Sequence, residues 1–158
     1  MLPTQGPRLF LLDANACNAL QQIVELNELE RLGRVGTIDL QYTETTWTEA
    51  QVGSALREAK VTRFVFSGLP DLDDLGLQQP WRDAIASIVF PNGIRNENQR
   101  RDVEALLTVK LAGGCFVTRD GASSTQPGGI LGHTAELAAI GIEVLSFSEA
   151  LECAQRAA

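Results

Sequence analysis

The sequence predicts a single α/β domain with a mostly parallel central sheet flanked by helices. Short apolar stretches at residues 8–12, 114–118 and 142–147 have the length of buried strands. They alternate with segments whose apolar residues recur at helical spacing, and this alternation is typical of parallel sheets rather than helix bundles. The 158 residues suit one domain, which we expect to span residues 8–158 after a flexible start at residues 1–7.

The first strand is followed by a helix and a second strand. Residues 15–34 carry apolar side chains every three to four positions, and Gly33 and Gly36 predict where that helix ends. Residues 35–42 alternate between apolar and polar side chains and include β-branched residues, which favours a strand.

Two helices are predicted in the middle of the chain. Residues 46–60 begin with Thr46 and Glu49, whose spacing is that of a capping box. Residues 80–90 form an apolar helix opened by a proline, and the Pro-Asn-Gly sequence at residues 91–93 ends it.

The last third of the chain has the clearest helical pattern. Residues 98–112 place their large apolar side chains on one face, and Gly113 and Gly114 supply a C-terminal cap before the strand at residues 114–118. We expect three further elements, a short helix, a strand and a helix, at residues 132–140, 142–147 and 148–157.

Composition limits the classes of function. The net charge of −7 argues against unspecific nucleic-acid binding, although charges are screened within about 8 Å, so a local basic patch can still bind phosphate. No apolar stretch approaches the roughly 20 residues that span a bilayer. The N-terminus lacks the pattern of a signal peptide, so we expect a cytoplasmic protein without membrane contact.

The cysteines are not expected to carry chemistry. Cys17, Cys115 and Cys153 are widely spaced, with no pair at metal-ligand spacing. Cys17 and Cys115 lie in apolar segments typical of small core residues. A catalytic thiol needs a basic neighbour, and the chain has a single histidine, His133, which we expect at the surface or at a helix start.

The two tryptophans, Trp47 and Trp81, are expected to anchor the core or an interface. Other aromatic side chains are few and not clustered, so the sequence offers no stacking platform for single-stranded nucleic acid.

Three aspartates are placed where they can share one site. Asp13 follows the first strand, Asp120 follows the strand at residues 114–118, and Asp102 lies near the start of the helix between them. The carboxyl ends of parallel strands meet at one edge of a sheet, where open α/β folds build their sites. Carboxylates gathered there repel one another unless they share a proton or a cation, which points to a divalent metal.

Two segments resemble PIN-domain ribonucleases. Residues 9–15 read Leu-Phe-Leu-Leu-Asp-Ala-Asn, an apolar strand followed by Asp and a small polar residue two positions later. Residues 102–120 begin with Asp on a helix, pass a Gly-Gly turn and end in Val-Thr-Arg-Asp, which is similar to the other half of the family pattern. The resemblance implies Mg²⁺ or Mn²⁺ held by Asp13, Glu49, Asp102 and Asp120, with Glu44 as the alternative to Glu49.

The resemblance also implies a reaction. The metal would lower the pKa of a water molecule and stabilise charge on the phosphate, so that the phosphodiester bond of single-stranded RNA is hydrolysed. Asn15 and Thr118 would orient the acids or the water. Family members often have a further acid shortly after the position of Asp120, and here Ser123 or Ser124 would take its place. Other residues would contact substrate phosphates, namely Arg119, Arg100 and Arg101.

The resemblance further implies a homodimer, and a neutralising antitoxin protein if the chain is a toxin. The alternative is a PIN-like scaffold with weak or no hydrolysis that binds RNA or protein. An aspartyl-phosphate phosphatase is disfavoured because Asn15 stands where those enzymes have an aspartate.

Each acid also has a purely structural interpretation. Asp13 can cap a helix, and Glu49 can be the capping-box partner of Thr46. Asp102 can stabilise a helix N-terminus through the helix dipole, and Asp120 can belong to an Asp-Gly turn.

Overall fold

A four-stranded parallel sheet forms the centre of the molecule in the computed structural model, which describes residues 7–13, 23–42, 78–120 and 129–157. The strands lie in the order β2-β1-β3-β4, and every neighbouring pair is parallel. Their bounds are Leu9–Leu12 for β1, Asp39–Tyr42 for β2, Cys115–Val117 for β3 and Glu143–Leu145 for β4. The predicted α/β class with a parallel sheet is therefore confirmed.

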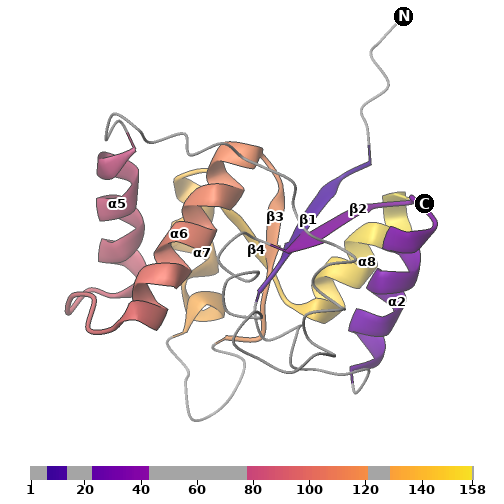
Figure 1. Cartoon of the computed structure of the whole chain (residues 1–158), viewed down its shortest axis with the longest axis horizontal. Coiled ribbons are helices and arrows are strands. Elements are labelled where there is room, and N and C mark those ends of the chain that lie inside the picture. Colours follow the sequence, from indigo (N-terminus) through magenta and orange to yellow (C-terminus); the bar gives the residue numbers. More distant parts are fainter. Residues whose placement is uncertain (1–6, 14–22, 43–77, 121–128, 158) are drawn as a thin grey trace, which may run out of the picture.

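Helices cover both faces of this sheet (Figure 1). One face carries α2 (Val24–Arg34) and α8 (Phe147–Ala157), which pack against each other. The other face carries α5, α6 and α7, and the short 3₁₀ helix η1 leads into α7. Their bounds are Gln79–Val89 for α5, Glu97–Ala112 for α6, Ile130–His133 for η1 and Thr134–Ala139 for α7.

Strand β1 separates two apolar cores. Successive strand side chains point to opposite faces, so Phe10 and Leu12 pack with α2 and α8, while Leu11 packs with α5, α6 and α7. All three side chains are fully buried. Burial on both faces explains why the strand has an uninterrupted apolar sequence instead of an alternating one.

Strand β2 is shorter than the strand predicted at residues 35–42, because residues 35–37 form the C-terminal end of helix α2 instead. The Val35 amide donates to the Arg31 carbonyl at 3.1 Å, and the Thr37 amide donates to the Leu32 carbonyl at 3.0 Å. Gly36, between them, has a φ of 79°, a conformation that favours glycine. These bonds satisfy carbonyls that a helix end leaves without partners.

Helix α6 begins and ends with clear caps. The Asn96 side chain accepts a hydrogen bond from the Gln99 amide at 2.9 Å, and Gly113 at the other end has a φ of 75°. The helix starts at Glu97, so Asp102 lies in its second turn. The effect of the helix dipole falls off within the first turn, so Asp102 lies too far along the helix for the structural interpretation in which it stabilises the helix start.

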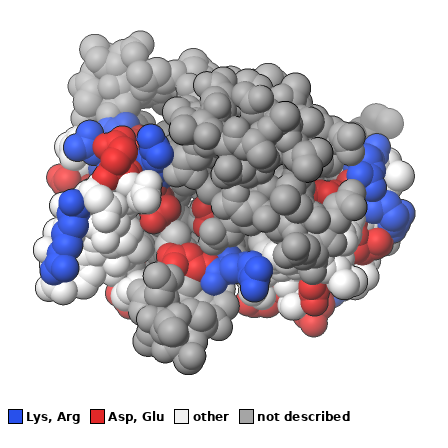
Figure 2. Space-filling view, turned by 60° about the horizontal axis from the view of Figure 1, so that its bottom comes forward, with Lys and Arg blue, Asp and Glu red and all other residues white. Residues whose placement is uncertain are grey.

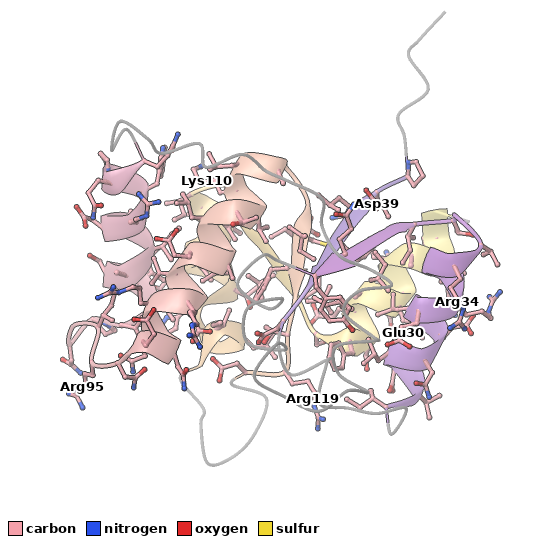
Figure 3. The ribbon with its side chains drawn as sticks, viewed as in Figure 1. Glu30, Arg34, Asp39, Arg95, Lys110 and Arg119 are labelled. Carbon is pink, nitrogen blue, oxygen red and sulfur yellow. The ribbon has the colours of Figure 1, made fainter. Side chains whose placement is uncertain are left out.

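Trp81 is an interface side chain rather than a core one. It is 39% exposed and lies on α5, with the Lys110 ammonium of α6 at 3.8 Å from its ring centroid. The same ammonium donates to the Ile140 carbonyl, at the end of α7, at 2.6 Å. Lys110 thus connects all three helices on this face, where Figure 3 labels it.

Several predicted features lie outside the described residues: the start of the helix at residues 15–34, the helix at residues 46–60, Cys17 and Trp47. None of the described helices combines the length and the apolar character needed to cross a bilayer.

Candidate functional site

Two of the predicted acids follow neighbouring strands. Asp13 comes directly after β1, and Asp120 comes three residues after the end of β3. The Asp13 amide donates to the Val117 carbonyl at 3.0 Å, which extends the pairing of β1 with β3 by one residue. Both acids therefore start from the same edge of the sheet.

Thr118 connects these two acids. Its side chain is fully buried, and its hydroxyl donates to Asp13 Oδ2 at 2.6 Å. The same hydroxyl oxygen accepts a hydrogen bond from the Asp120 amide at 3.0 Å. A hydroxyl–carboxylate distance of about 2.5–2.7 Å is typical of a charge-assisted hydrogen bond. The Asp13 carboxylate and the Asp120 backbone are thus held through one oxygen atom.

Asp120 is also tied to the chain that follows. Its Oδ2 atom accepts a hydrogen bond from the Ile130 amide at 3.1 Å, and its carbonyl accepts one from the Leu131 amide at 2.9 Å. These two bonds hold the start of η1 against the end of β3. A structural role for Asp120 is therefore visible, and it uses one oxygen of the carboxylate.

The third acid, Asp102, reaches the same end of the molecule from α6. This helix runs antiparallel to β3 and joins it through Gly113 and Gly114. Asp102 lies ten residues before Ala112, which is about 15 Å along a helix. Asp120 follows the carboxyl end of β3, in a turn that its amide closes by donating to the Thr118 hydroxyl. The two acids therefore lie toward the same end of the sheet.

The described acids do not by themselves make a metal site. No group of three or more His, Cys, Asp or Glu side chains close enough to hold an ion occurs within residues 7–13, 23–42, 78–120 and 129–157. Glu49 and its alternative Glu44, as well as Asn15, lie outside these ranges. The same holds for Ser123 and Ser124. All ligands expected here are oxygen atoms, which suits Mg²⁺ or Mn²⁺.

Basic side chains lie near this edge. Figure 2, which faces it, shows acidic side chains near the centre with a basic group beside them. Arg119 is exposed and extends from the edge in Figure 3. Within the described part of the chain it forms no hydrogen bond or ion pair. Arg100, on α6, is exposed and lies 3.7 Å from the Glu97 carboxylate of the same helix.

Cys115 is not a candidate nucleophile. Its side chain is fully buried, and burial raises the pKa of its thiol to about 12. The thiol donates to the Leu9 carbonyl at 3.6 Å. Nucleophilic attack requires the thiolate, so the expectation of a structural core cysteine is confirmed.

His133 pairs with a neighbour on its own helical segment. Its Nδ1 atom lies 3.1 Å from the Glu136 carboxylate, and its ring is partly buried. This position, at the junction of η1 and α7, agrees with the expectation of a histidine near a helix start.

A pocket of about 390 Å³ opens beside Thr118 and Arg119. Its other walls come from the first turn of α2, the start of η1 and the first turn of α8. They are formed by Ile23, Val24, Glu25, Leu131, Ser146, Phe147 and Ser148. No local sequence pattern marks these residues, because only the packing of α2 beside α8 brings the two helix starts together.

No protein-family model matches the chain, and neither does any of the curated proteins compared with it.

Proposed function

We propose that the protein is a divalent-metal-dependent endoribonuclease that hydrolyses phosphodiester bonds of single-stranded RNA. The observation that carries the proposal is the hydrogen-bonded connection of Asp13 and Asp120 through Thr118, at the carboxyl ends of adjacent parallel strands. Binding sites of open α/β folds lie at this edge. The resemblance of residues 9–15 and 102–120 to PIN-domain nucleases supports the same assignment.

In this proposal, Asp13, Glu49, Asp102 and Asp120 hold Mg²⁺ or Mn²⁺. When bound, such an ion supplies an activated water molecule and neutralises charge on the phosphate. Thr118 fixes one oxygen of Asp13, which leaves the orientation of that carboxylate defined before substrate binds. Arg119, exposed beside the acids, binds a substrate phosphate through its guanidinium group.

The proposal is tested by calorimetric titration of Mn²⁺ into the wild-type protein, Asp102→Asn and Asp120→Asn. We expect each variant to bind Mn²⁺ at least about tenfold more weakly, since a ligand or its charge is lost. Asp83→Asn is the matched control, because Asp83 is exposed on α5, away from the strand ends, and carries the same charge change. A fluorescent single-stranded RNA then reports Mn²⁺-dependent cleavage in the wild type.

A second candidate function is a binding module that keeps this scaffold without hydrolysis. It is favoured by the finding that the described acids do not form a three-ligand group. In that case the wild type and both site variants would bind Mn²⁺ equally weakly, and RNA would remain intact. Such a result contradicts the nuclease proposal.

A further inference from the structure

The pocket beside the acids has charged groups of opposite sign in its lining that do not neutralise each other. Glu25 contributes a half-buried carboxylate from the first turn of α2, and Arg119 contributes a guanidinium from the end of β3. Across the described residues, neither side chain forms an ion pair or a hydrogen bond. A ligand that fills this space must therefore offer hydrogen-bond donors to Glu25 and negative charge to Arg119.

The rest of the lining combines four apolar side chains with three hydroxyl-bearing ones. Val24, the first residue of α2, is 76% exposed, and it lines the pocket together with Leu131 and Phe147. A planar base placed against these side chains would cover Val24 and remove apolar surface from water. The volume of about 390 Å³ lies within the range of roughly 300–1,000 Å³ that is usual for ligand pockets.

From these contacts we infer that the pocket binds a guanine nucleotide of the RNA substrate next to the cleaved bond. This inference rests on the proposed ribonuclease function. A carboxylate accepts two parallel hydrogen bonds from the N1–H and N2–H groups of guanine, whereas the other three bases offer it only one nitrogen donor at that edge. Glu25 therefore selects the base, and Arg119 binds the phosphate attached to it.

The position of the pocket links it to the acids. Thr118 lines the pocket and donates its hydroxyl to Asp13, and Arg119 lies between Thr118 and Asp120 in the chain. A nucleotide in this pocket consequently places its neighbouring phosphodiester toward the carboxylates. Figure 3 shows Arg119 at this edge, on the same side as the start of α2.

The test measures binding of 5′-GMP and 5′-UMP to the full chain in EDTA, so that no metal is involved. We expect the wild type to prefer 5′-GMP by about tenfold, the ratio that one additional hydrogen bond to a charged group supplies. Glu25→Gln should remove this preference. Glu28→Gln is the matched control, because Glu28 lies one turn further along α2, pairs with Arg31 and does not line the pocket.

Arg119→Gln should lower the affinity for 5′-GMP and for 5′-UMP to the same extent. The affinity for guanosine, which has no phosphate, should stay unchanged. Equal binding of 5′-GMP and 5′-UMP by the wild type, or an unchanged preference in Glu25→Gln, would overturn the inference. Melting temperatures measured for each variant show that the comparison is made on folded protein.

Mn²⁺-dependent cleavage separates this inference from the function on which it rests. RNA cleavage with no preference for a guanine next to the cut, unchanged in Glu25→Gln, overturns the guanine site and leaves the nuclease intact. Selective 5′-GMP binding that depends on Glu25, without any cleavage, supports the nucleotide site and contradicts the nuclease.

Discussion

At the scale of single residues, Thr118 connects two of the proposed metal ligands through its side chain. Its hydroxyl is fully buried and serves as donor to Asp13 and as acceptor from the Asp120 amide. Removal of this one hydroxyl therefore removes two hydrogen bonds at the same time. A hydrogen bond to a charged group contributes about 1.5–3 kcal/mol, and a neutral one about 0.5–1.5 kcal/mol.

We expect Thr118→Val to lower the free energy of unfolding by about 2 kcal/mol or more and to weaken Mn²⁺ binding. Urea denaturation followed by circular dichroism measures the first effect, and calorimetry the second. Thr118→Ser is the control, since it keeps the hydroxyl and loses only a methyl group, worth about 1 kcal/mol. Equal destabilisation by valine and serine would show that packing, and not the hydrogen bonds, makes Thr118 important.

Cys115 gives a prediction about pH. The pKa of its thiol is about 12 in the folded protein, against a reference value of 9.0. The unfolded chain therefore loses this proton at lower pH than the folded chain. The stabilisation that the buried thiol provides is fully present below about pH 9 and is lost as the pH rises toward 12.

We expect the difference in unfolding free energy between wild type and Cys115→Ala to shrink by about 1.4 kcal/mol for each pH unit above about pH 9. Urea titrations of both proteins between about pH 7 and pH 10.5 measure it. Subtracting the variant cancels the titration of the other cysteines, of tyrosine and of lysine. A difference that does not change with pH would show that the Cys115 thiol ionises normally in the folded protein.

At the scale of elements, the turn between α6 and β3 contains two adjacent glycines with different requirements. Gly113 has a φ of 75°, and a Cβ atom added there would meet only open space, so its requirement is conformational. A Cβ atom on Gly114 would lie 2.9 Å from the Leu9 carbonyl oxygen, so the requirement there is space against the central strand.

The two glycines should consequently respond to different substitutions. At position 113, asparagine should be tolerated better than alanine, which costs about 1–2 kcal/mol, because asparagine adopts positive φ more readily. At position 114, both residues should destabilise by about 1–3 kcal/mol, and asparagine more than alanine because it is larger. Thermal unfolding of the four variants checks this order. The same order of alanine and asparagine at both positions would contradict it.

Element types were predictable from the sequence because their signals are local. The apolar sequence of β1 and the helical spacing in α6 depend only on neighbours in the chain. The start of β2 was misplaced because Val35, Gly36 and Thr37 lie in a stretch with a strand-like pattern and yet complete the C-terminus of α2. Backbone hydrogen bonds of a helix end outweighed the side-chain preference at these positions.

The site was only partly predictable for a related reason. The positions of Asp13 and Asp120 at one edge follow from strand order, which the alternation of elements indicates. The pocket depends on how α2 and α8 pack, so no local pattern marks Glu25 or Phe147 as neighbours of Arg119. The contact between Lys110 and Trp81 is a further product of tertiary packing.

At the scale of the whole molecule, the net charge of −7 means that the proposed RNA substrate would be bound through a few local contacts. We expect the affinity for single-stranded RNA, measured in EDTA by fluorescence anisotropy, to fall with salt concentration. Arg119→Gln should reduce the slope of log affinity against log salt by about 0.7, the value for one phosphate contact on a single strand.

Arg34→Gln is the control for this measurement, because Arg34 is exposed at the far end of α2, away from the pocket (Figure 3). It changes the net charge by the same amount. Equal reductions of the slope in both variants would show that total charge governs RNA binding and that Arg119 makes no specific phosphate contact.

The central sheet divides the interior of the described structure into two apolar cores, one closed by α2 and α8 and the other by α5, α6 and α7. Local unfolding of one helical layer therefore exposes one core and leaves the packing of the other unchanged. The pocket has most of its walls in the layer of α2 and α8. Thermal fluctuations that widen this pocket can thus occur without loosening α6, so access to the pocket and the rigidity of the helix that carries Asp102 are separable properties of the fold.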